Sequence, residues 1–402
     1  MHLTYRPANA GDIDACLEML PGGFPVPFRA RLAQAWHAWL RDGIMQMVVL
    51  EDAHRPPDDR RIAFGSSVFV SAEFAEEAKT TLPPPLAAQV VRRWHTGCSP
   101  VLSLDAVREA NSGPGLTLLV LHIGWLPRLS ADDVRWAKAR LLEALLFFHS
   151  GYLLNEVLQE VISEDERDRG LAAGASVKND YAAFYAAHPE LLPPPEHRPF
   201  LIGGSRAETR DGSYLSPLFF YRPPHFFFKR GEQELLRLAL LDCEDEAVVS
   251  ELHLSSSTIQ KRWRTIYDRV TLAEPGFFPL GGSADSGTRG AAKRRRLLSY
   301  LRGHPEEMHP VHAPRRSEMR GASVRRAPQT PAPPSRSIRP SETSVEASGT
   351  GALLLPGTVT RKSWLASGSV EDGSSPPVRA NVPVYTPGTA VSESIFTSKK
   401  PP

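Results

Sequence analysis

A segment near residue 260 carries amide, hydroxyl and cationic side chains at spacings that suit contact with duplex DNA. Its apolar residues recur at intervals of four, three and four: Ile259, Trp263, Ile266 and Val270. This spacing predicts a helix with one buried face. The opposite face then carries Gln260, Lys261 and Arg264, which can hydrogen-bond to base edges in a major groove. Ser257 and Thr258, near the start of the helix, can bind phosphate oxygens.

Positive charge is concentrated on the same predicted helix. Arg262 and Arg269 join Lys261 and Arg264, and Asp268 is the only acid among them. A solvated charged face usually mixes the two signs more evenly, so this pattern favours an anionic partner. The complete set of predicted DNA-binding residues is Ser257, Thr258, Gln260, Lys261, Arg262, Arg264 and Arg269. The alternative is a small helical bundle that contacts protein instead of DNA.

Two shorter helices are predicted before this one. Leucines between 235 and 240 give the first a buried face, and Asp242 and Cys243 interrupt it. The second begins with acids at 244–246, where the helix dipole favours negative charge, and its inward positions are Ala247, Val248, Val249 and Leu252. Ser255 or Ser256 then caps the third helix.

This three-helix segment resembles the LuxR-type helix-turn-helix of bacterial response regulators. The resemblance covers about a tenth of the chain: the opening Glu232 to Leu238, the end of the second helix at Leu252, and the stretch Ser255 to Lys261. It implies that Gln260, Lys261 and Arg264 contact bases and that Thr258 contacts phosphate. The sequence departs from the family at Trp263 and Tyr267, which are bulkier than usual, and it lacks the usual Leu-Gly ending.

Residues 1–187 alternate strand-like and helix-like patterns, which predicts an α/β domain. Leu116 to Leu126 is a nearly continuous apolar run of the kind found in central strands, and a helix follows from about Asp132. The order of elements resembles the GNAT acetyltransferase fold, with LTYRPANAGDIDACLEML as its first strand and helix. The resemblance implies an acyl-CoA core at the long strand.

The loop that corresponds to the pyrophosphate-binding loop of that family lacks the glycines that the family uses there. GNAT enzymes cradle a pyrophosphate with a Gly-rich loop, because backbone N–H groups must approach the phosphates closely. The stretch Pro127 to Trp136 has no glycine and places Asp132 and Asp133 where phosphate charge would lie. Gly170 stands near the position of the family's usual catalytic Tyr. We therefore expect no catalytic residue and no bound cofactor.

The net charge, the cysteine spacing and the hydropathy of the chain exclude several other classes of protein. The formal net charge of +2 requires any basic surface to be local, and the three cysteines lack zinc-ligand spacing, so no metal site is predicted. No signal peptide is visible, and Leu116 to Leu126 is about half the length that a membrane span needs. We expect a cytoplasmic protein that does not contact a membrane. His95 and Cys98 are predicted to be structural, and His122 to be a core or edge histidine.

The predicted organisation has five regions: a GNAT-like α/β domain at 1–187, a Pro-rich aromatic connection at 188–228, an all-α LuxR-type helix-turn-helix at 229–272, a linker with a flanking helix at 273–312, and a disordered tail at 313–402. The predicted function is transcription regulation through double-stranded DNA, with the first domain as ligand sensor or dimerisation platform. A homodimer and a small-molecule effector are further partners that this interpretation admits. The alternatives are an acyl-CoA-dependent N-acyltransferase with an appended helical module, and an interaction adaptor that does not bind DNA.

Overall fold

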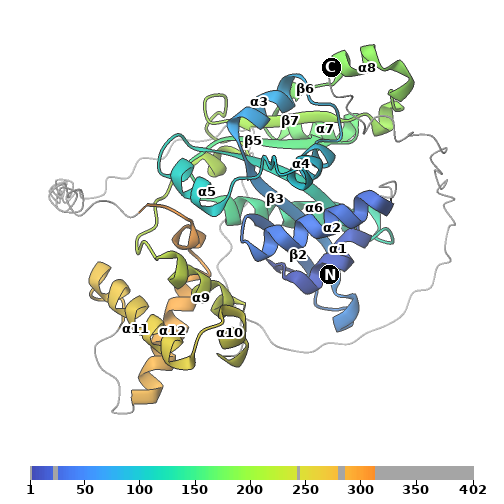
Figure 1. Cartoon of the computed structure of the whole chain (residues 1–402). Helices are drawn as coiled ribbons and strands as arrows, with labels where there is room; N and C mark the ends of the chain where they lie inside the picture. Colours follow the sequence, from blue (N-terminus) through green and yellow to red (C-terminus); the bar gives the residue numbers. More distant parts are fainter. Residues whose placement is uncertain (1, 21–25, 242–244, 279–285, 313–402) are drawn as a thin grey trace, which may run out of the picture. The chain divides into compact units, whose positions relative to one another are not determined.

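The first part of the chain is built on a seven-stranded sheet. The computed structural model describes residues 2–20, 26–241, 245–278 and 286–312 (Figure 1). The strands lie in the order β1-β2-β3-β4-β5-β7-β6. Their bounds are β1 Leu3–Pro7, β2 Met45–Asp52, β3 Arg61–Val70, β4 Leu116–Trp125, β5 Leu154–Val161, β6 Ser176–Asn179 and β7 Phe200–Ser205.

The sheet is mixed, since β4 and β5 pair in parallel and the other neighbours pair antiparallel. The register of β3 and β4 shifts between Ser66 and Ser67, which leaves Leu121 as an extra residue on β4. Pairing of β4 with β5 ends at Val120 and Gln159, although β4 continues for five residues beyond that point to Trp125. The two central strands therefore separate toward their carboxyl ends.

Helices cover both faces of this sheet (Figure 1). One apolar core joins the sheet to five of them: α1 Ile13–Glu18, α2 Val26–Arg41, α3 Ala72–Thr80, α4 Leu86–His95 and α8 Ala182–Ala187. Trp36 and Trp39 of α2 are fully buried there. On the other face, α6 Ala131–His149 buries Ala137 and Leu141 against β2 and β3. The remaining helices of this part are α5 Leu104–Asn111 and α7 Glu164–Ala172.

A second apolar core belongs to four helices that follow the sheet. They are α9 Arg230–Leu240, α10 Asp245–Leu252, α11 Ser256–Ala273 and α12 Ser286–Leu301. Leu235 and Leu236 of α9, Ile266 of α11 and Leu297 of α12 are all fully buried in this core. Because each helix contributes apolar residues to one shared core, α9–α12 form an all-α module.

Most of the predicted elements are present, and four assignments need correction. Residues 200–205, assigned to the connection, form β7 between β5 and β6, so the sheet extends beyond residue 187. Toward the end of the predicted α/β domain at 1–187, β6 stops at Asn179 and the chain continues as α8. Helices α3 and α5 were not predicted, and Ala247, expected to face inward, is exposed.

The aromatic connection divides between the two parts, since Phe219 packs in a further apolar cluster with residues of β4 and β5, while Phe226 and Phe228 join the core of the helical module. The predicted interruption at Asp242 and Cys243, and the tail at 313–402, lie outside the described residues. Within the described part, no helix is long and apolar enough to cross a membrane.

Candidate nucleic-acid interface

Helix α11 begins at a capped turn. The Ser255 hydroxyl accepts a hydrogen bond from the Thr258 backbone N–H at 3.3 Å, and it lies 3.0 Å from the Ser257 hydroxyl. Of the two serines predicted to cap the helix, Ser255 is the one that does so. His253, in the turn before it, has φ of 50°, in the left-handed region that allows the chain to reverse between α10 and α11.

The cap is expected to contribute measurably to the stability of the helical module. Replacing Ser255 with Ala leaves the Thr258 N–H without its acceptor and should cost about 1 kcal/mol of unfolding free energy. Urea unfolding of the full chain measures this. Ser250→Ala, at an exposed position on α10, is the control and should change the unfolding free energy little. Equal effects of the two variants would contradict the capping role.

The inward face of α11 matches the predicted stripe. Ile259, Trp263, Ile266 and Val270 are 5%, 8%, 0% and 0% exposed. They contact the same core as Leu235 and Leu236 of α9. This packing fixes which side of α11 faces outward.

The outward face carries the polar residues of the sequence prediction. Gln260, Lys261 and Arg264 are exposed, and their side chains form no hydrogen bond or ion pair with any residue that the structure describes. Ser257 and Thr258 are exposed at the amino-terminal end of the helix. The structure thus brings five of the seven predicted residues onto one accessible surface, which we call the outward face of α11.

Arg262 and Arg269 lie elsewhere, on the side of α11 that faces α9. Arg262 Nη1 donates to the Gly231 carbonyl oxygen at 3.0 Å. Arg269 Nε donates at 2.9 Å to the carboxylate of Glu232, whose residue is only 4% exposed. These two cations therefore fasten α11 to α9, a role that periodicity along one helix could not predict.

The two bulky residues of α11, Trp263 and Tyr267, support the neighbouring helix α12. Their rings stack at a centroid separation of 5.6 Å. The Arg294 guanidinium lies 4.9 Å from the Trp263 ring centroid and also pairs with Asp245 at 2.8 Å. Lys293 Nζ is 6.0 Å from the Tyr267 centroid. The residues that depart from the LuxR-type pattern thus hold cations of α12 beside α11.

The loop before α6 does not fit a cofactor pyrophosphate. The Ser130 hydroxyl already accepts from the Asp133 N–H at 3.1 Å, so the helix supplies its own cap. Asp132 is exposed and Asp133 is half-buried in the first turn, and Arg128 pairs with Asp59. Phosphate oxygens at this helix end would meet two carboxylates, whose like charge opposes binding. We therefore derive no reaction step through coenzyme A.

A buried polar cluster lies near the end of β5, and the sequence analysis missed it. Glu160 accepts hydrogen bonds from the Tyr181 hydroxyl at 2.7 Å and from the Leu86 N–H at 2.9 Å. Burial raises the pKa of Glu160 to about 7. Tyr181 is 2% exposed and has φ of 55°, an uncommon backbone conformation for a bulky residue. The sequence signal was weak, because β5 also carries Asn155, Glu156 and Gln159, and nothing in its pattern distinguishes Glu160 from them.

The raised pKa of Glu160 predicts a pH dependence of stability. Because the folded pKa lies above the ordinary value of 4.5, the carboxyl group contributes most below pH 4.5, and this contribution is lost as the pH rises toward 7. Glu160→Gln keeps an acceptor for the Leu86 N–H and a donor for the Tyr181 oxygen, but it does not titrate. The unfolding free energy of the wild type should therefore fall relative to that of the variant between pH 4.5 and about 7, the window between the two pKa values. Parallel pH profiles would contradict the assignment.

The remaining polar candidates have structural surroundings. His122 is 8% exposed, its ring centroid lies 5.4 Å from that of Trp36, and burial lowers its pKa to about 4. Cys98 is exposed and His95 Nε2 lies 3.2 Å from the Arg31 carbonyl oxygen. In the described part of the chain, no cluster of His, Cys, Asp and Glu has the arrangement of a metal site.

Comparison with known proteins gives similarity to solved structures alone. No family model matches the sequence, and no curated protein matches it. A spermidine/spermine N-acetyltransferase SpeG from Vibrio cholerae, in complex with manganese ions, is 11% identical, with 51% of this chain and 94% of that chain covered and a TM-score of 0.28. The spermidine N-acetyltransferase from Vibrio cholerae in complex with CoA and spermine is 11% identical, with coverage of 53% and 98% and a TM-score of 0.30.

The sheet itself, with its parallel β4–β5 pair at the centre, is a mixed α/β sheet consistent with a GNAT-like fold over the first half of the chain.

Proposed function

We propose that α9–α11 form a helix-turn-helix of the LuxR type and that the protein is a DNA-binding transcription regulator. The observation that carries this proposal is the outward face of α11. Its amide and cationic side chains, Gln260, Lys261 and Arg264, are exposed and unpaired within the described residues, while the opposite stripe is buried. A helix with this division of faces can enter a major groove, which is wide enough to hold one helix.

The expected contacts with DNA are of two kinds, contacts with bases and contacts with phosphates. Lys261 and Arg264 can donate to acceptors on guanine, and the Gln260 amide can pair with adenine, so these three would read sequence. Ser257 and Thr258, at the end of the helix where the dipole is positive, would hold phosphate oxygens and set the position of the module on the duplex. Arg262 and Arg269 are not among the proposed DNA contacts, because the side chains of both already bond to α9.

The test is binding of the full chain to mixed-sequence duplex DNA across a salt series. Counterion release makes affinity fall with salt in proportion to the number of phosphates contacted. We expect binding at low salt that weakens steeply as salt rises. No binding at any salt concentration would overturn the proposal and favour an adaptor that contacts protein.

A second candidate function, N-acyl transfer by the α/β part, is favoured by one feature. Strands β4 and β5 separate beyond Val120 and Gln159, and Glu160, with its pKa of about 7, lies on β5 just past that point. A carboxyl group with such a pKa is suited to accept a proton near neutral pH. The loop before α6 opposes this candidate, since its cap and acids do not fit a pyrophosphate.

Acetyl-CoA titration by calorimetry separates the two candidates for the α/β part. Heat of binding that saturates, with release of free thiol on addition of an amine, would support acyl transfer. Absence of heat would leave this part as the platform we propose, a ligand sensor or dimerisation domain for the regulator.

A further inference from the structure

Helix α12 carries four consecutive cations that divide into two pairs. Lys293 and Arg294 lie against aromatic rings, with Lys293 Nζ 5.3 Å from the Phe278 centroid. Arg295 and Arg296 are exposed, and neither pairs with a carboxylate among the residues that the structure describes. Lys293 and Arg294 therefore join α12 to its neighbours, and Arg294 also pairs with Asp245. Arg296 too lies beside a ring, that of Phe277, but no described carboxylate matches its charge or that of Arg295, so this second pair is available to an external anion.

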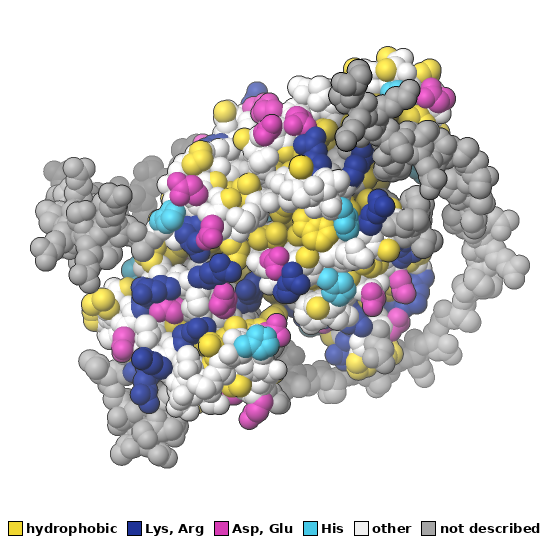
Figure 2. Space-filling view, viewed as in Figure 1, with side chains coloured by type: hydrophobic (Ala, Val, Ile, Leu, Met, Phe, Trp, Pro, Cys, Tyr) yellow, Lys and Arg dark blue, Asp and Glu magenta, His cyan; other side chains and the backbone are white. Residues whose placement is uncertain are grey.

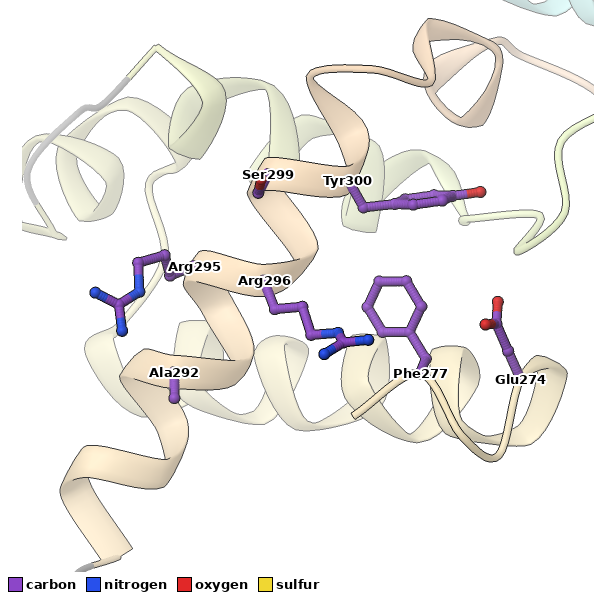
Figure 3. Close-up of a pocket in the computed structure, with 7 residues that line it drawn as sticks. All are labelled: Glu274, Phe277, Ala292, Arg295, Arg296, Ser299 and Tyr300. Carbon is purple, nitrogen blue, oxygen red and sulfur yellow. The ribbon is translucent and has the colours of Figure 1, made fainter. Parts of the chain in front are cut away.

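The available pair borders a hollow of about 640 Å³ on the helical module (Figure 3). The Arg296 guanidinium extends toward Phe277 and lies 5.5 Å from its ring centroid, while Arg295 extends from α12 on the other side. Ser299, one turn further along α12, is exposed and adds a hydroxyl donor. Glu274 lies beyond Phe277 and would repel an anion, so a ligand would favour the α12 side of the hollow.

The chemistry of this surface selects a phosphate-bearing ligand. Guanidinium groups match phosphate oxygens in geometry and charge, and a serine hydroxyl can complete the contact. Because the two guanidiniums extend in different directions, one phosphate group would not engage both. An extended polyanion with several phosphates would.

We propose that Arg295 and Arg296 contact the sugar-phosphate backbone of the duplex bound by α11, which makes α12 a second DNA-contacting element. The proposal rests on the proposed function of α11. Its structural basis is the direct attachment of α12 to α11, through Arg294 on the Trp263 ring and Lys293 near the Tyr267 ring. Contacts of this kind position the module and carry no sequence information.

The matched variants are Arg295→Gln/Arg296→Gln and, as the control, Arg41→Gln/Arg135→Gln. The control removes the same charge from side chains that are 73% and 79% exposed on the α/β part. Affinity of the full chain for mixed-sequence and for selected duplexes is measured from low to high salt. Loss of two phosphate contacts should lower the salt slope by about 2 and weaken binding to both duplexes by about the same factor, on the order of tenfold. The control should change neither quantity.

The outcomes separate this inference from the proposed function. If the wild type binds DNA and the Arg295→Gln/Arg296→Gln variant retains the control's affinity and slope, the inference about α12 is wrong and the role of α11 stands. If the wild type does not bind DNA, both are wrong. The wild type and the Arg295→Gln/Arg296→Gln variant are also titrated with inorganic phosphate and with ATP. If the variant loses ATP binding but keeps its DNA binding unchanged, the two arginines bind a free nucleotide, and the proposed contact with the DNA backbone is wrong.

Discussion

The double substitution Lys261→Ala/Arg264→Ala is expected to weaken duplex DNA binding by at least ~30-fold, or about 2 kcal/mol. Both side chains are exposed on the outward face of α11 and lack partners within the described residues, so their removal leaves the fold without a broken contact. A lysine or arginine that contacts a base is worth roughly 1–3 kcal/mol each. Electrophoretic or fluorescence titration of a preferred duplex measures the loss.

Two comparisons make this result specific. Arg41→Ala/Arg135→Ala removes two cations from the α/β part and should leave affinity unchanged, which excludes an effect of net charge alone. Urea unfolding of Lys261→Ala/Arg264→Ala should match the wild type, because exposed positions contribute little to stability. Unchanged DNA affinity in this variant would remove α11 as the recognition helix.

The second large effect is expected at Glu232, where replacement by Ala should cost about 3 kcal/mol of unfolding free energy. Its carboxylate accepts from the Lys229 N–H at 2.7 Å at the start of α9 and pairs with Arg269 at 2.9 Å. The substitution therefore removes the helix-start acceptor and leaves a partly buried guanidinium without its counter-charge. Urea unfolding of the full chain, monitored by near-ultraviolet circular dichroism, reports the loss.

Glu234→Ala is the control for this substitution on the same helix. Glu234 pairs with Arg230 at 3.2 Å, but that arginine is 59% exposed, and exposed pairs of this spacing contribute about 0.5 kcal/mol or less. If the two glutamates prove equally dispensable, Arg269 is not held by Glu232 and returns to the candidate DNA contacts. A large loss at Glu232 alone supports its structural role.

Sequence periodicity predicted the elements whose contacts are local. The stripe of α11 from Ile259 to Val270 is buried as its spacing requires, since one helix face repeats within a few residues. Roles that depend on another element were beyond this reasoning. Arg262 and Arg269 resemble the proposed DNA-contacting cations in type and position, and only the packing of α9 shows that they are half-buried and bonded to that helix.

The sheet also contains an element, β7, that the sequence pattern did not predict. β7 follows the Pro-rich stretch at 188–199, and its sequence FLIGGS is short and contains two glycines, so composition favoured a connection over a strand. Its partner residues on β5 are about 45 positions away, for example Val157 opposite Gly204. The Glu160 cluster depends likewise on Leu86 and Tyr181 from distant segments.

Figure 2 shows why bulk charge could not locate the interface. On the visible face, basic, acidic and apolar side chains are interspersed, in keeping with a net charge of +2 for the whole chain. The proposed recognition surface is instead defined by which cations of α11 have no partner among the described residues. Which cations are unpaired depends on how the helices pack, and the amino-acid composition does not reveal it.

Selection from a pool of randomised duplexes tests the central claim most directly. The wild-type full chain and the Lys261→Ala/Arg264→Ala variant would each undergo several rounds of binding at increasing salt, followed by sequencing. We predict that the wild type enriches a defined sequence and that the variant does not, because the side chains that read the bases are gone. A wild-type pool that stays random, or that is never retained, would contradict sequence recognition by α11.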